Sequence, residues 1–269
     1  MSNAVGQFTG AVTPAGSQGA AIEQARAAME VQAAVAVAQA NPRSEAVVMD
    51  SMRSSCSRYA TAVKAKYNVP NRGTGASVHL ARELARIWGN LDYGVRELSR
   101  DDVKGESEIQ AYAWDQQTNV RSIRSFIVPH ERMARKQRNK LVDLGDIYLN
   151  NQNQGAKAVR ECIFAVLPPW FKDEALDLCE QTLQRGSDLS AAPVPVADRT
   201  AKMLAAFAGV QVTESQISKR LGKAKADWTD QDIAALTVVY QSITAEGIAA
   251  SEFFEVEGPQ VGALMAVAE

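Results

Sequence analysis

Alternation of apolar and polar residues marks three neighbouring stretches in the middle of the chain. In the second stretch, Ala111 and Ala113 alternate with the rings of Tyr112 and Trp114. A period of two is typical of strands that bury one face. Short polar links between such strands favour antiparallel neighbours, so we predict a three-stranded meander. The three predicted strands span residues 91–100, 107–115 and 120–128.

Spacings of three and four between apolar residues predict helices on both sides of this meander. The clearest helix has Ser77 as its N-cap and ends at Gly89. Farther along, Thr213 and Thr229 each precede a Gln or an Asp by three residues, a pattern typical of helix starts. The predicted helices span residues 20–40, 44–64, 77–88, 156–167, 170–185, 200–208, 213–221 and 229–243.

These elements predict an α+β fold. We expect an antiparallel sheet of three to five strands, a β-β-β-α core packed by helices, and a small all-helical C-terminal domain. The N-terminal residues are small and polar, which favours a disordered leader, and Pro193 and Pro195 favour a linker. The predicted divisions are a leader at 1–19, a core at 20–186, a linker at 187–197, a helical domain at 198–257 and a tail at 258–269.

The charge of the chain is unevenly distributed. A chain of 269 residues can bury a substantial core, and its 46% hydrophobic and 22% charged residues are those of an ordinary globular protein. Its net charge is −2. From Trp228 to Glu269, however, there is no Lys or Arg, whereas the middle of the chain is basic. The average therefore conceals a patch that could bind nucleic acid.

The cysteines and the apolar runs indicate the cellular compartment in which the protein works. Cys56, Cys162 and Cys179 are odd in number and widely spaced, so we expect no disulfide framework. No signal peptide or membrane-spanning run is recognisable. We therefore expect a cytoplasmic protein.

Catalytic motifs are missing from the sequence. It contains neither GxxxxGK[ST] nor GxSxG, and its two histidines, His79 and His130, favour structural or surface roles over a zinc site. The carboxylates around Asp101 and Glu106 are weak candidates for metal ligands. We expect no enzyme activity, no metal and no cofactor.

Basic side chains gather in the strand, the polar segment and the helix that follow one another between residues 121 and 160. Arg121 and Arg124 are three apart on a strand and so lie on opposite faces, whereas Lys157 and Arg160 are three apart on a helix and share one. A solvated loop before a core helix is the competing interpretation, and Tyr112 could stack on bases or simply pack on the sheet. The candidate nucleic-acid contacts are Lys66, Arg72, Arg121, Arg124, Arg132, Arg135, Lys136, Arg138, Lys140, Gln154, Lys157 and Arg160.

The order of these parts resembles the single-strand annealing proteins. This group includes the phage RecT-like, Erf-like and Red-beta recombinases and the eukaryotic ring-forming annealing protein of recombinational repair. The resemblance covers roughly residues 22–185, and a C-terminal block resembles the helical piece of RecT-like proteins. The residues that carry it are 72–75, 77–90, 107–115, 153–160 and 212–222.

The resemblance implies ATP-independent binding of single-stranded DNA and annealing of complementary strands in phage recombination, by an oligomeric ring or filament. Carried onto this chain, it places Lys157 and Arg160 in the DNA groove from a helix and Arg72 from a hairpin. It also implies that the C-terminal domain contacts host single-strand-binding protein or a phage exonuclease, in the host cytoplasm. The competing hypotheses are an oligomeric scaffolding protein whose basic run pairs with an acidic neighbour, and a metal-dependent nuclease.

Overall fold

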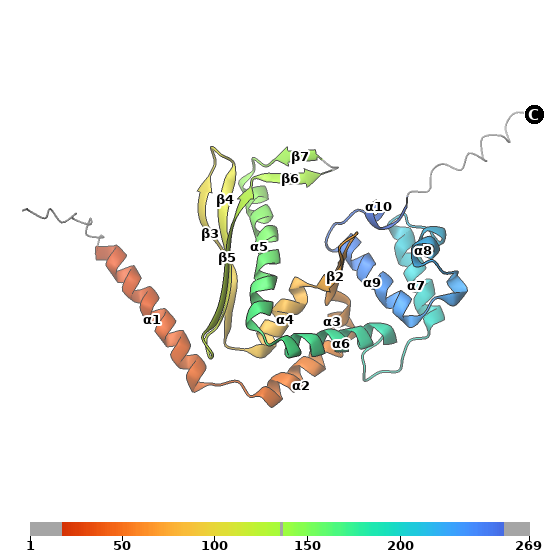
Figure 1. Cartoon of the computed structure of the whole chain (residues 1–269), viewed down its shortest axis with the longest axis horizontal. Coiled ribbons are helices and arrows are strands. Elements are labelled where there is room, and N and C mark those ends of the chain that lie inside the picture. Colours follow the sequence, from red (N-terminus) through yellow and green to blue (C-terminus); the bar gives the residue numbers. More distant parts are fainter. Residues whose placement is uncertain (1–17, 135–136, 256–269) are drawn as a thin grey trace, which may run out of the picture. The chain divides into compact units, whose positions relative to one another are not determined.

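The computed structural model describes residues 18–134 and 137–255, in two compact units that divide after Pro42 (Figure 1). The first unit contains helix α1 (Gln18–Ala40), which matches the helix predicted at 20–40. On its surface Arg26 forms ion pairs with Glu23 and Glu30. The predicted leader, apart from its last two residues, and the predicted tail lie outside the described residues. Among the described residues, no helix is long and apolar enough to cross a membrane.

The second unit begins at Arg43 and contains all the strands among the described residues. Its N-terminal elements are α2 (Glu45–Cys56), α3 (Tyr59–Lys64), β1 (Lys66–Val69), β2 (Gly73–Ala76) and α4 (Val78–Trp88). The central elements are β3 (Leu91–Asp101), β4 (Glu106–Asp115), β5 (Val120–Pro129), β6 (Glu131–Ala134), β7 (Gln137–Lys140) and α5 (Leu144–Val166). The C-terminal elements are α6 (Pro169–Arg185), α7 (Val196–Gly209), α8 (Glu214–Leu221), the 3₁₀ turn Lys225–Asp227, α9 (Asp230–Thr244) and α10 (Ala250–Phe253).

The predicted meander is confirmed as an antiparallel sheet in the order β3-β4-β5. Ala111 at its centre lies opposite Val95 on one side and Arg124 on the other. Two separate hairpins, β1-β2 and β6-β7, complete the strands. The α+β class, with a β-β-β-α core and helices at the C-terminal end, is therefore confirmed.

Helix α5 covers one face of the sheet at close range. The Cys162 Sγ lies 3.6 Å from the carbonyl oxygen of Ala111 on β4. A Cβ atom on Gly155 would come within 2.6 Å of Val95 on β3, so only glycine permits this approach. Because the β4 residues on this face are small, the helix backbone can sit near the strands. Tyr112 and Trp114 lie on the face directed away from α5, since side chains alternate along a strand.

Three predicted boundaries are wrong. The helix predicted at 44–64 is two helices, because the Ser57 hydroxyl donates to the Arg53 carbonyl and Arg58 is extended, which ends α2. Helix α5 begins at Leu144 rather than at residue 156, because the Asp143 carboxylate caps it. The basic run predicted as a loop forms β6 and β7.

The C-terminal helices pack around a second core that includes Phe207, Ile217 and Trp228. Both predicted capping boxes, at Thr213 and Thr229, are confirmed. Helix α9 belongs to both cores, because its residues Ala234 and Val238 pack into the first and Ile233, Leu236 and Val239 into the second. Independent folding of residues 198–257 stays a prediction.

Candidate nucleic-acid interface

The exposed side of α5 carries a polar row on successive turns. Asn150, Gln154 and Lys157 lie four and three residues apart, so they share one side of the helix. The exposed Lys157 donates from Nζ to Gln154 Oε1 over 3.2 Å. Asn150 donates from Nδ2 to the Pro129 carbonyl over 3.2 Å, which ties the row to the end of β5. Two of the predicted DNA contacts, Gln154 and Lys157, therefore touch each other.

The β6-β7 hairpin displays the described part of the basic run. Arg132 lies opposite Asn139, and Lys140 lies opposite Glu131. The Arg138 side chain is 78% exposed, with one guanidinium nitrogen 3.8 Å from the Glu131 carboxylate. Arg132 and Lys140 are also exposed. The two remaining predicted contacts of this run, Arg135 and Lys136, lie outside the described residues.

A cavity of about 300 Å³ lies where the end of β5, the β6-β7 hairpin and α5 meet. The polar row of α5 and the hairpin both contribute to its wall, so Gln154 and Arg138 come together from separate elements. The cavity is lined by Phe126, Ile127, Val128, Pro129, Glu131, Arg138, Asn150 and Gln154.

Arg160 and Lys66 occupy a different environment, although both were predicted as DNA contacts. The Arg160 guanidinium is paired with Glu161 and lies 4.8 Å from the centre of the Tyr67 ring on β1. Lys66 on the same strand is 2.5 Å from a carboxylate oxygen of Glu180 on α6. Both cations are already neutralised within the chain. Their described contacts attach the β1-β2 hairpin to α5 and α6.

Arg72 lies at the exposed tip of the β1-β2 hairpin, as the sequence predicted. The turn requires positive φ at Asn71 and Gly73, with values of 62° and 87°. Its described contact is a backbone hydrogen bond from the Arg72 N–H to the Val69 carbonyl. Arg72 is thus accessible, but no described contact joins it to Lys157.

Arg121 and Arg124 lie on opposite faces of β5, as their spacing predicted. Arg124 is opposite Ala111, on the side covered by α5, where its charge acts on Cys162. Arg121 is opposite Trp114, and its guanidinium lies 5.8 Å from the centre of that ring. On the same face Arg96 lies 4.4 Å over the Tyr112 ring, so an arginine already covers each aromatic ring. Arg121 therefore does not join the polar row of α5.

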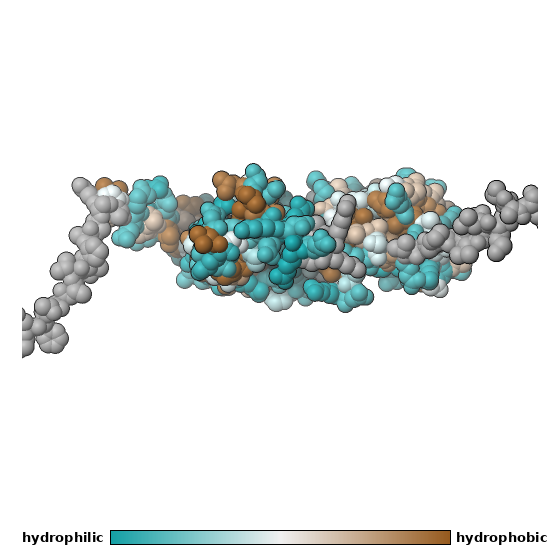
Figure 2. All heavy atoms as spheres, turned by 90° about the horizontal axis from the view of Figure 1, so that it is seen from above, coloured by the Kyte–Doolittle hydropathy of each residue, from teal (hydrophilic) through white to brown (hydrophobic). Residues whose placement is uncertain are grey.

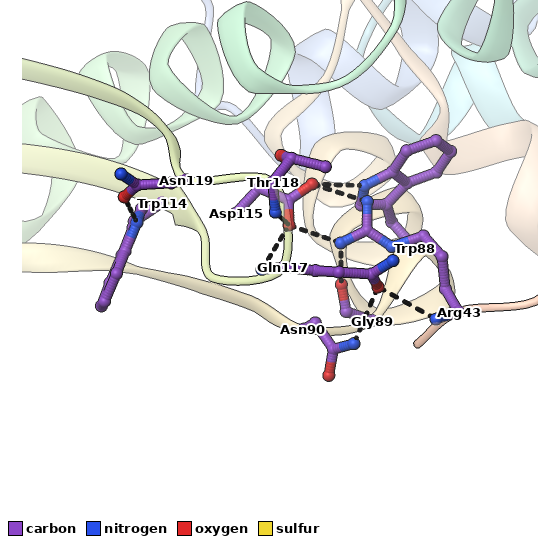
Figure 3. Close-up of polar contacts among 9 residues, drawn as sticks. All are labelled: Arg43, Trp88, Gly89, Asn90, Trp114, Asp115, Gln117, Thr118 and Asn119. Carbon is purple, nitrogen blue, oxygen red and sulfur yellow. Dashed lines mark hydrogen bonds and ion pairs between the residues drawn. The ribbon is translucent and has the colours of Figure 1, made fainter. Parts of the chain in front are cut away.

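The most buried ion pair, which Arg43 forms with Asp115, has no signature in the sequence (Figure 3). Their side chains are only 10% and 3% exposed. The two guanidinium nitrogens lie 2.6 Å and 2.5 Å from the two carboxylate oxygens, and the Trp88 Nε1 donates to the same carboxylate over 3.1 Å. Arg43 is distant in sequence from the meander, so no local pattern could have paired the two.

The Asp115 carboxylate is held ionised. Burial acts to raise its pKa, but hydrogen bonds from Arg43 and Trp88 and the charge of Arg43 outweigh it and leave the pKa below its usual value. The same carboxylate also accepts backbone N–H groups of Gln117 and Thr118 in the turn after β4. The cluster therefore joins the segment before α2, the end of α4 and the β4-β5 turn, and its role is structural.

The histidines and cysteines provide no reactive centre in the described part of the chain. His130 is buried, with Nε2 2.8 Å from the Ser107 hydroxyl, so it cannot reach a phosphate, and His79 is exposed. All three cysteines are free and buried. No group of three or more His, Cys, Asp or Glu residues could hold a metal ion within residues 18–134 and 137–255.

Comparisons of this chain with protein-family models, with characterised proteins and with solved structures found no match. The assignment of a function therefore depends on the arrangement of side chains. That arrangement has two parts: an exposed group at Gln154, Lys157 and Arg138 around one cavity, and neutralised cations at Lys66 and Arg160 beside the first hairpin.

Proposed function

We propose that this protein binds single-stranded DNA without ATP and anneals complementary strands in phage homologous recombination, as a homo-oligomer in the host cytoplasm. The observation that carries the proposal is the meeting of Gln154, Lys157 and Arg138 beside one cavity. Lysine and arginine contacts to phosphates bind a strand without reading its sequence. Three antiparallel strands followed by a long helix are also the parts on which the resemblance to annealing proteins rests.

Regular secondary structure supports this role, because annealing requires the strand to be held by its phosphates while most of its bases stay available. Lys157 projects from a helix fixed against the sheet by the close approach of Gly155 to Val95. Arg138 projects from a hairpin whose base is closed by the hydrogen bond from the Leu141 N–H to the His130 carbonyl. Both cations therefore project from a helix or a strand.

Self-association is supported by exposed apolar side chains at the start of α5. Val142, Leu144, Tyr148 and Leu149 are 81%, 65%, 56% and 57% exposed. Figure 2 shows apolar residues as separate brown areas among hydrophilic ones on the side of the molecule in view. Leu144 and Tyr148 are four residues apart and share one side of α5, and exposed apolar groups that lie together favour contact with another protein. A second copy of the chain is the partner we propose, with host single-strand-binding protein or a phage exonuclease as further partners of the C-terminal helices.

The test combines strand annealing with charge reversal. Two complementary fluorescent oligonucleotides are mixed with the protein in the absence of nucleotide, and duplex formation is followed. We expect the wild-type protein to accelerate annealing and the K157E/R138E variant to bind more weakly and no longer accelerate it. If each cation neutralises one phosphate, the magnitude of the log-log salt slope falls by about 0.7 for each phosphate that the variant no longer neutralises. Its melting temperature should not change, because both side chains are exposed.

Lys202 provides the matched control. It is an exposed lysine on α7, so K202E reverses one charge away from α5, just as the single variant K157E reverses one charge on it. We expect K202E to bind and anneal like the wild type and K157E to lose affinity. Equal losses in K202E and K157E would reduce the effect to net charge and contradict the assigned site.

The exposed apolar residues also favour a second candidate, an oligomeric scaffolding protein without a nucleic-acid role. In that case the exposed basic hairpin pairs with acidic residues of a neighbouring copy. Added salt then disperses the oligomer and oligonucleotides do not compete with its assembly. Sedimentation velocity over a range of salt, with and without an oligonucleotide, separates the two candidates.

A further inference from the structure

The cavity between β5, the β6-β7 hairpin and α5 has two kinds of wall. Phe126, Ile127 and Pro129 contribute apolar surface from the end of β5. Asn150 and Gln154 contribute side-chain amides from α5. Its volume of about 300 Å³ lies at the small end of the range for ligand pockets. A small, flat group with an apolar ring and polar edges is the kind of group that such walls accommodate.

The two amides keep complementary groups available for a ligand. Gln154 accepts from Lys157 through Oε1, which leaves its NH₂ group as a donor. Asn150 donates through Nδ2 to the Pro129 carbonyl, which leaves its Oδ1 as an acceptor. A donor and an acceptor side by side match the edge of a nucleobase, which carries both kinds of group. An apolar side chain in the same place would bury the remaining Gln154 NH₂ group and Asn150 Oδ1 without partners, at a cost in free energy.

Charged side chains lie at the rim of the cavity. Lys157 touches Gln154, and the exposed Arg138 contributes to the wall, so cations lie beside the cavity on both the helix and the hairpin. A base that enters this cavity brings its own phosphates close to them. We propose that the cavity takes one nucleobase from the bound single strand, while Lys157 and Arg138 contact the adjoining phosphates. This inference rests on the proposed function and extends it from phosphate contact to base contact.

The test separates bases from phosphates with two oligonucleotides of equal length, one of deoxyadenosines and one built entirely of abasic residues. Both carry the same phosphates. We expect the wild-type protein to bind the deoxyadenosine strand about tenfold more tightly, because holding a base against a protein surface contributes that order of affinity. Equal affinity for the two strands would overturn the base pocket and leave the proposed function intact. No binding of either strand would overturn both.

A filled cavity tests the location. Gln154 is half-buried and lies in the wall, so Q154W is expected to block the cavity. Asn153, the preceding residue of α5, is exposed and does not contribute to the wall, which makes N153W the matched control. We expect Q154W to bind the deoxyadenosine strand as weakly as the abasic one, with unchanged affinity for the abasic strand. N153W should keep the full preference.

One result would contradict this location: a Q154W protein that keeps the preference for bases. If its sedimenting mass also falls, the cavity is assigned to a side chain of a second copy. Because a new tryptophan can disturb folding, the Q154M variant provides a second measurement: it removes the amide and retains the helix, and it should reduce the preference without lowering affinity for the abasic strand.

Discussion

Two groups of charged residues in this protein contain similar cations in different environments, one buried and paired, the other exposed. Around Asp115, the guanidinium of Arg43 is 10% exposed and both of its terminal nitrogens contact one carboxylate. Around Gln154, the cations Lys157 and Arg138 are exposed, with a neutral amide and a carboxylate 3.8 Å away as their described partners. In the first group both carboxylate oxygens accept hydrogen bonds from protein donors, whereas the cations of the second group can still exchange water for a ligand.

The difference follows from the free energy of desolvation. A charge taken out of water needs a close partner, and removing that partner leaves an uncompensated buried charge. An exposed charge contributes little to folding, because water and salt screen it. Contribution to stability and availability for binding should therefore be inversely related among the cations of this chain.

Substitution of Asp115 tests the buried ion pair with Arg43 and should give the largest change in stability. In the D115N variant Arg43 stays charged and buried without its carboxylate, so we expect a loss of about 3–5 kcal/mol in the free energy of unfolding, measured in urea. Asp102 is the matched control: it is 71% exposed and paired with Arg100, and D102N should change stability by less than about 1 kcal/mol. Similar losses in the two variants would contradict the comparison.

The pH dependence of stability checks the same carboxylate. Its pKa in the folded protein is lower than in the unfolded chain, where an Asp titrates near about 3.9. The ionised form therefore contributes stability that is fully present above that pH and is lost as the pH falls toward the folded pKa. D115N lacks this contribution, so the difference between wild type and variant should narrow below about pH 4. A difference that stays constant from about pH 7 to about pH 3 would argue against a lowered pKa.

The sequence predicted the strands better than the long helix, for a physical reason. Strands β3, β4 and β5 alternate clearly, and their predicted bounds differ from the observed ones by at most one residue at each end. The first half of α5 presents Asn151 and Gly155 to the sheet, where helices usually present apolar residues. Glycine is there because a Cβ would collide with Val95. Tertiary packing therefore decided what the local pattern could not.

Gly155 gives the second prediction. In G155A the new Cβ comes within 2.6 Å of one Val95 methyl and 2.8 Å of the other, so the helix must shift. Alanine favours helices over glycine by about 1 kcal/mol, but overpacking costs about 1–3 kcal/mol, and we expect a net loss of stability. Gly209, the last residue of α7, has no atom within 4 Å of its ideal Cβ. In thermal unfolding of both variants, G209A should therefore have an unchanged or higher melting temperature and G155A a lower one.

Only part of the candidate site could likewise be predicted from the sequence. Residue type and spacing were enough to name Lys157, Gln154 and Arg138 as candidates, and the structure leaves Lys157 and Arg138 exposed. Residue type and spacing could not show that Lys66 is neutralised, because Glu180 lies 114 residues away, or that Arg160 lies over the ring of Tyr67. Arg43 was missed for the same reason, since its partner lies 72 residues away. Long-range pairing is the part that spacing does not encode.

The third prediction compares two cations on one helix face and should give the smallest change in stability. Arg160 lies over Tyr67 and pairs with Glu161, whereas Lys157 contacts a neutral amide. We expect R160M to lower stability by about 0.5–1 kcal/mol, the usual contribution of a cation over an aromatic ring, and K157M to leave it unchanged.

In strand binding we expect the opposite order, with K157M losing more affinity than R160M, because only Lys157 has its charge available. A double-mutant cycle with Y67L should locate the lost stability of R160M at the ring, since the two changes would then not be additive. The opposite result would be an R160M protein that keeps its stability but loses more strand affinity than K157M. It would show that a cation with an internal ion pair can still bind the strand.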